Sequence, residues 1–155
     1  MEHKELNLQM VNNDENVARI IFSPSYIFQG RVSPTAFRWN VLPSGDVEDY
    51  ISVLRDDGGN LNEESQNFRP RIQGDERYGY ALLNVGDVRD ISQSVLLEDT
   101  TSIDVQPFPS KKLLNHAGIQ VVLDGMIVDA NTPVNAEIMA IQKELAMLCS
   151  DVVPF

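Results

Sequence analysis

An apolar stripe near the C-terminus constrains the fold more than any other feature of the sequence. Between residues 134 and 148, apolar residues recur every three or four positions, which places them on one face of an α-helix. Thr132 and Pro133 suit the cap and the first position of such a helix. A helix with one apolar face must bury that face against another layer. The stripe consists of Val134, Ile138, Ile141, Leu145 and Leu148.

Two kinds of partner could cover this stripe. One is a sheet of the same chain. The other is the same helix of a second copy, because the spacing also fits two heptads of a coiled coil. Two heptads are short for a helix pair, so we expect the helix to pack on its own sheet. A homodimer through Val134, Ile138, Ile141, Leu145 and Leu148 is the alternative hypothesis.

The rest of the chain shows mainly strand patterns. Five runs of β-branched and aromatic residues, each bounded by turn residues, lie at 17–23, 50–55, 78–85, 102–107 and 116–123. Asp124-Gly125 stands between two apolar runs, which is the strongest short signal for a β-hairpin. Residues 88–91 are predicted to continue the third strand after a break at Gly86-Asp87, residues 95–97 are a short apolar run, and 62–66 and 110–115 are predicted as short helical turns. We therefore predict an α+β fold, in which a mostly antiparallel sheet of about five or six strands packs against one C-terminal amphipathic helix.

The length and the absence of a linker predict one domain. The chain has 155 residues, domains typically have about 100–150, and residues 1–155 are predicted to form a single α+β domain. Leu6, Leu8 and Met10 alternate with polar residues, so residues 1–16 are either mobile or an edge strand. Cys149 is the only cysteine, which excludes a disulfide bond or a cysteine-based zinc site within one chain.

The charge balance limits the kinds of partner. Against 23 Asp and Glu residues there are 12 Lys and Arg residues, and the net charge is −11. This charge repels phosphate backbones and anionic lipid surfaces, so we expect neither nucleic acid nor membrane as a partner, whereas a basic protein would suit it. The sequence shows no apolar stretch of the ~20 residues that a membrane span needs and no apolar core of a signal peptide. We therefore expect a cytoplasmic protein.

The sequence lacks the common motifs that indicate a catalytic site. It contains no G-x-S-x-G nucleophile elbow, no phosphate loop and no dinucleotide fingerprint. Residues 56–64 are acidic but lack the residue order of a calcium loop, and Asp46, Glu48 and Asp49 are interpreted as a solvated face. We predict no metal and no cofactor. The first hypothesis for the function is accordingly a protein-binding or accessory module.

Three features of the sequence each allow two interpretations: the connection at 24–49, the arginines and His116. The long connection at 24–49 contains several aromatic residues, which either pin it onto the core or, through Phe37 and Trp39, line a ligand pocket. All eight arginines lie between Arg19 and Arg89, where they either pair with neighbouring acids or build an anion site. His116, at the start of an apolar strand, is either a structural hydrogen-bonding residue or part of a site.

Several stretches together resemble a known group of proteins. These are Val32-Ser33-Pro34-Thr35-Ala36-Phe37, Tyr50-Ile51-Ser52-Val53-Leu54-Arg55, Tyr80-Ala81-Leu82-Leu83-Asn84-Val85 and His116-Ala117-Gly118-Ile119. The order V-S-x-x-A-F, I-S-V and H-A-x-I resembles a group of short bacterial proteins without a known activity. The resemblance spans about residues 17–120, implies a bacterial origin and draws attention to Phe37, Ser52, Arg55 and His116.

A second resemblance, to ribosyl-transfer enzymes that use NAD, supplies the enzyme hypothesis. Such enzymes place an arginine or histidine on an early strand and a serine on a following one, as Arg19 and Ser52 are placed here. Their catalytic glutamate has no counterpart in the third to fifth predicted strands. The resemblance implies a cleft near Arg19, Ser52, Arg55 and His116, covered by the 24–49 connection. Because it rests on analogy, it stands as the alternative to a binding module.

Overall fold

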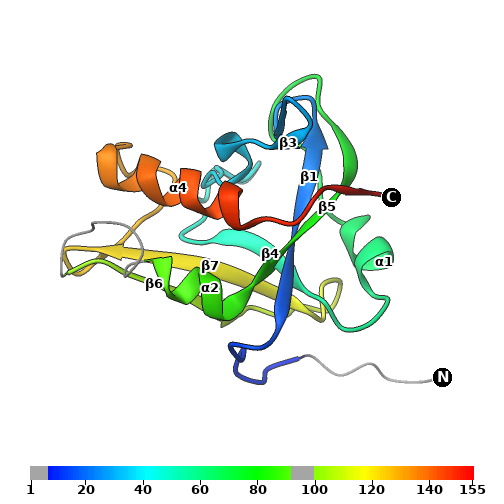
Figure 1. Ribbon diagram of the computed structural model, residues 1–155, viewed down its shortest axis with the longest axis horizontal. Coiled ribbons are helices and arrows are strands. Elements are labelled where there is room, and N and C mark those ends of the chain that lie inside the picture. The colour runs from blue at the N-terminus through cyan, green and yellow to red at the C-terminus, as the bar shows by residue number, and fades with distance from the viewer. Residues whose placement is uncertain (1–6, 92–99) are drawn as a thin grey trace.

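The computed structural model describes residues 7–91 and 100–155, and Figure 1 shows a main sheet with helices packed around it and a small separate hairpin. The strands of the sheet are β1 (Asn16–Ser23), β4 (Ile51–Arg55), β5 (Glu76–Asn84), β6 (Ser102–Pro107), β7 (His116–Leu123), β8 (Met126–Ile127) and β9 (Val153–Pro154). Their order in space is β6-β7-β4-β1-β5-β9, with β8 paired to β7. The pairs are antiparallel. The predicted α+β fold with an antiparallel sheet and a C-terminal helix is confirmed.

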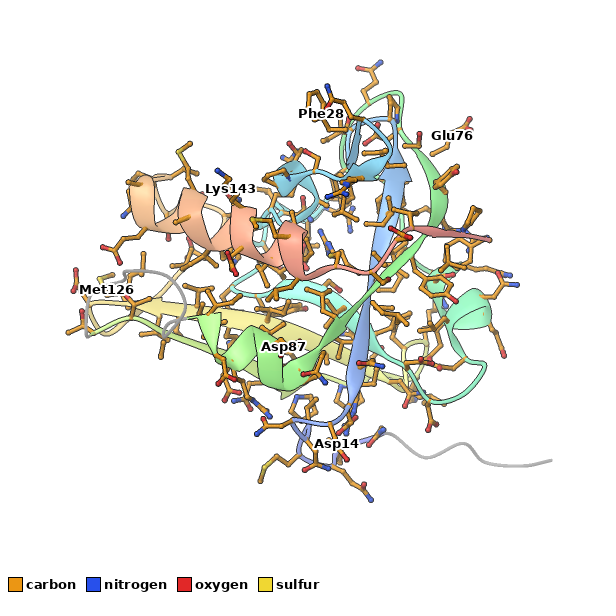
Figure 2. All side chains as sticks on the ribbon, in the orientation of Figure 1. Asp14, Phe28, Glu76, Asp87, Met126 and Lys143 are labelled. Atoms are coloured by element: carbon orange, nitrogen blue, oxygen red, sulfur yellow. The ribbon has the colours of Figure 1, made fainter. Side chains whose placement is uncertain are left out.

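Each of the five predicted strands lies within two residues of an observed strand. The predicted hairpin is also confirmed, because Asp124 and Gly125 have φ angles of 50° and 79° and join β7 to β8. Positive φ at both central residues is what a type I′ turn requires. Met126 beside the turn is exposed and projects away from the body of the protein (Figure 2).

Of the local predictions between the strands, two are wrong and one is confirmed. Residues 88–91 do not extend β5, because α2 (Val85–Arg89) begins directly after it, and the side chain of Asn84 caps α2 by accepting a hydrogen bond from the amide of Asp87 at 3.0 Å. Residues 110–115 form bends and turns without a helix. The predicted turn at 62–66 is confirmed as α1 (Leu61–Ser65). Residues 95–97 lie outside the described part of the chain.

The connection at 24–49 lies against the core and contains short elements of its own. These are β2 (Ile27–Phe28), β3 (Arg31–Val32) and the 3-10 helix η1 (Pro34–Ala36). Tyr26, Phe37 and Trp39 are buried within the apolar core cluster, whereas Phe28 is exposed at the turn between β2 and β3 (Figure 2). These buried aromatic side chains therefore hold the connection against the core, which was the first of the two interpretations of this segment.

The C-terminal helix, α4 (Ala136–Leu148), begins later than predicted. Its cap is Asn135, whose side chain accepts a hydrogen bond from the amide of Ile138 at 2.9 Å. Thr132 instead forms a turn with Asp129, in which its hydroxyl accepts a hydrogen bond from the Asp129 amide at 3.0 Å. Val134 therefore precedes the helix and is exposed. No helix in the described residues is long and apolar enough to cross a membrane.

The apolar stripe of α4 belongs to the core of its own chain. Ile138, Ile141 and Leu145 have no exposed surface and lie in the same cluster as the buried residues of the sheet. The homodimer through Val134, Ile138, Ile141, Leu145 and Leu148 stays a prediction, and it would have to form without the three central side chains, which are buried in their own chain.

We expect Ile141→Ala to lower the free energy of unfolding by about 2–5 kcal/mol, because it leaves a cavity in the core. The matched change on the opposite face, Met139→Ala, removes a side chain that is 61% exposed and should change that free energy by less than about 0.5 kcal/mol. Urea denaturation followed by circular dichroism measures both. If both substitutions change the free energy of unfolding by the same small amount, and light scattering gives the mass of two chains, the stripe contacts a second copy.

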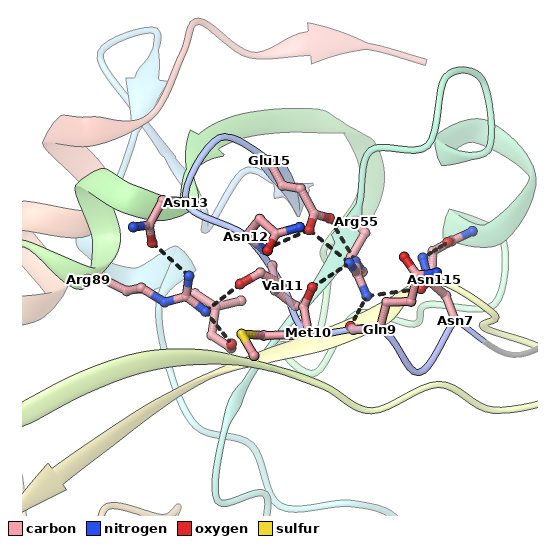
Figure 3. A network of polar contacts seen from close by, with 11 residues as sticks. Asn7, Gln9, Met10, Val11, Asn12, Asn13, Glu15, Arg55, Arg89 and Asn115 are labelled. Carbon is pink, nitrogen blue, oxygen red and sulfur yellow. Dashed lines mark hydrogen bonds and ion pairs between the residues drawn. The ribbon is translucent and has the colours of Figure 1, made fainter.

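Arg55 fastens the segment before β1 to the sheet (Figure 3). Its guanidinium is 4% exposed and donates hydrogen bonds to the Glu15 carboxylate at 2.8 and 2.9 Å, to the Gln9 carbonyl at 2.6 Å and to the Asn7 side chain at 3.1 Å. Residues 7–15 form no strand. Besides Arg55, Arg89 holds this segment through hydrogen bonds to Asn13 and Val11, and the Asn7 amide donates to the Leu114 carbonyl at 3.0 Å. Burial raises the pKa of Glu15, but the hydrogen bonds from Arg55 and from the Asn12 amide outweigh it and leave that pKa below its usual value.

Replacing Arg55 by alanine should lower the free energy of unfolding by about 2–4 kcal/mol, because several part-buried hydrogen bonds of a buried guanidinium are lost at once. The control is Arg31→Ala, which removes an exposed guanidinium and should have an effect within about 0.5 kcal/mol. Chemical denaturation compares the two variants. If Arg55→Ala is as stable as Arg31→Ala, the network in Figure 3 contributes little to the folded state.

Candidate functional site

Three of the four residues nominated for a cleft line one pocket. Arg19 on β1, Ser52 on β4 and His116 on β7 surround a cavity of about 180 Å³. The connection at 24–49 contributes one side of this cavity, and the segment after α1 contributes another. The remaining lining residues are Phe22, Tyr26, Asn40, Glu48, Tyr50, Asn67, Phe68, Arg69, Arg71 and Leu113.

The register of β4 against β7 brings Ser52 and His116 together. Leu54 is opposite His116 and Ser52 is opposite Gly118, so Ser52 is the diagonal neighbour of His116 on one face of the sheet. The Ser52 Oγ and the His116 Nε2 form a hydrogen bond. The contact is buried, since both residues have less than a tenth of their surface exposed.

A second hydrogen bond decides which nitrogen of His116 bears the proton. The His116 Nδ1 lies 2.9 Å from the carbonyl oxygen of Phe108. A carbonyl oxygen can only accept, so Nδ1–H is the donor in this contact. In the neutral ring Nε2 is then unprotonated and accepts the hydrogen bond from the Ser52 hydroxyl. This is the arrangement in which a histidine can take a proton from a serine.

Aromatic rings enclose His116 and keep it neutral. The ring of Tyr50 packs edge-to-face against the imidazole, with 5.6 Å between the ring centroids, and the ring of Phe68 packs in the same way at 6.2 Å. Burial lowers the pKa of His116 below its usual value, and the Phe108 carbonyl and Glu64 oppose this to a smaller extent. Gly118 makes room for Tyr50, because a Cβ at this position would lie 2.7 Å from the ring. The Tyr50 ring also stacks on the Phe108 ring, with 4.7 Å between the centroids. This stacking holds Tyr50 in place over the histidine.

Arg19 brings a buried positive charge to the pocket. Its guanidinium donates to the Ser52 carbonyl at 2.6 Å and to the Ala36 carbonyl at 2.7 Å, and it lies over the Tyr26 ring at 5.5 Å. The residue is 4% exposed. No carboxylate oxygen of the described residues lies within 4.0 Å of it. A buried cation without a direct ion pair raises the affinity of the adjoining cavity for negative charge.

Glu48 is the residue that sequence reasoning missed. It was interpreted as part of a solvated face, yet it is 9% exposed and lines the pocket, whereas Asp46 and Asp49 are exposed as expected. Burial raises the pKa of Glu48, and the charges of Arg19 and Arg71 together with a hydrogen bond from Asn40 partly offset this. An alternation signal existed in the sequence, because residues 48, 50 and 52 share a face when the chain is extended.

The structure does not bring the other nominated residues to this pocket. Arg55 follows Ser52 on β4 by three positions, and alternate residues of a strand face opposite sides of a sheet. Its guanidinium binds the N-terminal segment instead. Phe37 is fully buried in the core, and Trp39 lines a separate hollow beside Gln142. In the described residues no group of three or more His, Cys, Asp or Glu side chains could hold a metal ion.

Comparisons of this chain with protein-family models, with curated proteins and with solved structures find no match. The resemblances to short bacterial proteins and to ribosyl-transfer enzymes therefore stay predictions. The presence of Glu48 in one pocket with Arg19 and Ser52 supplies an acidic residue that the second resemblance lacked, although it precedes Ser52 in the chain.

The assigned tautomer and the burial of His116 predict a specific pH behaviour. A long-range ¹H–¹⁵N NMR spectrum at pH 7 should show neutral imidazole with the proton on Nδ1, and titration should give a pKa below 6.5. The unfolded chain then binds a proton that the folded chain does not, so the free energy of unfolding should fall as the pH drops below 6.5. His116→Gln removes both the signal and this part of the pH dependence. A proton on Nε2, or a pKa above 6.5, would contradict the assignment.

Proposed function

We propose that this protein is a small-molecule hydrolase or transferase, in which Ser52 is the nucleophile and His116 the general base. The observation that supports this proposal is the chain of hydrogen bonds from Ser52 Oγ through His116 to the Phe108 carbonyl, placed in the wall of a cavity. A nucleophile bonded to a base, which is itself oriented by a third group, is the general arrangement of nucleophilic catalysis.

The chemistry that fits this arrangement is attack on a small ester. The Ser52 oxygen forms a bond to the carbonyl carbon, the electron pair of the C=O bond moves onto its oxygen, and the hydroxyl proton passes to Nε2 of His116. Collapse of this intermediate breaks the bond to the leaving alcohol, which takes up the proton from His116. Water then attacks the acyl carbon and gives a proton to Nε2 of His116, and the bond to the Ser52 oxygen breaks as that oxygen takes the proton back, which releases the acid. The positive charge of Arg19 beside Ser52 favours the negative charge that develops on the oxygen.

The Phe108 carbonyl, which orients His116, limits the rate of ester hydrolysis that we expect. A backbone carbonyl orients the imidazole as a carboxylate would, but it is uncharged and stabilises the imidazolium less. The cavity of about 180 Å³ has room for about six water molecules at 30 Å³ each, so it suits an acyl group of only a few heavy atoms. Arg69 and Arg71 are exposed lining residues and add positive charge at the mouth.

The binding-module hypothesis stays a prediction beside this proposal. Met139 and Met147 on the outer face of α4 are exposed apolar side chains that a protein partner could cover. The ester-hydrolase proposal is preferred because its hydrogen bonds define a direction of proton transfer, whereas exposed methionines by themselves select no partner chemistry.

A small alkyl fluorophosphonate tests the proposed nucleophile. We expect the Ser52 oxygen to displace fluoride from phosphorus, with the proton passing to His116, so that intact-mass spectrometry shows one added phosphonyl group per chain. Ser52→Ala should abolish this label, and His116→Gln should slow it by about 100-fold or more. Ser44→Ala, which removes an exposed hydroxyl, is the matched control and should react like the wild type.

Two outcomes of this experiment would overturn the proposal. The first is a folded protein that takes up no label on Ser52. The second is a label whose rate is the same in His116→Gln, since the hydrogen bond would then only join β4 to β7. Circular dichroism of each variant separates loss of reactivity from loss of fold.

A further inference from the structure

The wall of the pocket around Ser52 has an excess of positive charge, in a chain whose net charge is −11. Three of the eight arginines line this cavity, namely Arg19, Arg69 and Arg71. Among the described residues, no carboxylate oxygen lies within 4.0 Å of any of the three. The described lining contains a single acidic residue, Glu48, and burial raises the pKa of its carboxyl group. The charge of this wall therefore favours an anionic ligand.

The chain between α1 and β5 presents two of these arginines, Arg69 and Arg71, at the mouth of the cavity. Both side chains are exposed, whereas Phe68 and Ile72 on either side of them pack against the core cluster. The ring of Phe68 also packs against the imidazole of His116, so the segment begins beside the proposed base. A proline stands between the two arginines, and its fixed φ limits the freedom of the segment. The two cations are thus held near the reacting groups and remain open to solvent.

Arg71 is the arginine of this wall whose guanidinium is free to bind a ligand. Arg19 donates to two backbone carbonyls, and Arg69 donates to the carbonyl of Phe68 at 3.0 Å. The guanidinium of Arg71 forms no hydrogen bond and no ion pair within the described part of the chain. Its charge nevertheless lowers the pKa of Glu48, so it lies close to the buried wall of the cavity. A free guanidinium binds a planar carboxylate through two parallel hydrogen bonds.

Two further carboxylates lie near the cavity without lining it, those of Glu64 and Asp49. Their charges act on the pKa values of titratable lining residues. The Glu64 carboxylate accepts hydrogen bonds from Asn115 at 2.9 and 3.1 Å and borders a different hollow. Asp49 is exposed, so solvent and salt screen its charge. Neither carboxylate therefore occupies the guanidinium of Arg71.

We propose that the substrates are monoesters of short dicarboxylic acids, and that Arg71 selects them by binding the free carboxylate of the acyl group. This inference rests on the proposed hydrolase function, because it requires the ester carbonyl to lie at Ser52. Arg19 favours the charge that develops during attack, whereas Arg71 binds a charge that is present throughout the reaction and takes no part in proton transfer. The cavity of about 180 Å³ admits few heavy atoms, so the acyl chain between its two carboxyl carbons is short.

The test compares the mono-p-nitrophenyl ester of fumaric acid with that of fumaramic acid, which has a neutral carboxamide in place of the carboxylate. The trans double bond prevents the carboxylate from attacking its own ester. Each kcat/KM is divided by the rate of spontaneous hydrolysis of the same ester. We expect the wild type to prefer the fumarate by about 10- to 100-fold at low ionic strength. This preference should shrink when salt is raised from about 20 mM to about 500 mM.

Two substitutions that each remove one exposed arginine assign this preference to a residue. Arg71→Gln should bring the ratio close to one, mainly by slowing the fumarate ester. Arg31→Gln makes the same change in charge at an exposed residue outside this cavity and should keep the preference. If the wild type hydrolyses both esters equally, or if Arg71→Gln keeps the preference, the selectivity of Arg71 is refuted while the hydrolase stands.

A binding experiment decides the role of Arg71 if neither ester is hydrolysed. Monomethyl fumarate, but not methyl fumaramate, should shift the Arg71 Nε–H signal in an NMR titration. Its dissociation constant should rise by about 10-fold or more in Arg71→Gln and stay unchanged in Arg31→Gln. Equal shifts with both compounds, or none with either, would overturn the inference.

Discussion

The pocket depends on the separation of β1 from β4. β1 follows β5 along its whole length but pairs with β4 only at Val17↔Arg55 and Ala18↔Leu54. Beyond these pairs the carbonyl of Ser52 has no partner on β1, and the guanidinium of Arg19 donates to it. The same side chain binds the Ala36 carbonyl and so joins the connection at 24–49 to the sheet. A buried carbonyl without a donor is costly, so Arg19 both closes this gap and gives the cavity its charge.

Burial favours the neutral form of the titratable groups in and near this cavity. Burial lowers the pKa of His116 and raises the pKa of Glu48, so it favours the neutral form of both. A neutral histidine beside a serine hydroxyl is ready to accept its proton. The thiol of Cys149 is also kept in its neutral form, because burial raises its pKa to about 12, so it is protonated near neutral pH and is a poor nucleophile. Among these side chains, Ser52 is the one with a base in contact.

An alternation that begins before β4 and enters it explains which site residues the sequence could predict. Residues 48, 50 and 52 alternate with residues 49, 51 and 53, and the pocket contains the first set. By the same rule Arg55 faces away from Ser52, so its nomination together with Ser52 conflicted with the strand that the sequence itself predicted. Asn40 could not have been found in this way. Its place beside Glu48 comes from a single bridge between Val41 and Val47 in a connection without strand-like sequence.

By itself the sequence determined the strands at 17–23, 50–55, 78–85, 102–107 and 116–123, the Asp124-Gly125 hairpin and the apolar face of the C-terminal helix, because each depends on the spacing of neighbouring side chains. Only the tertiary structure decided which strands pair, and with them the contact of Ser52 with His116 across 64 positions. It also decided that Ile138, Ile141 and Leu145 of α4 are buried in the core of their own chain. These outcomes depend on the register of distant strands and on the burial of polar groups between them, which no local spacing encodes.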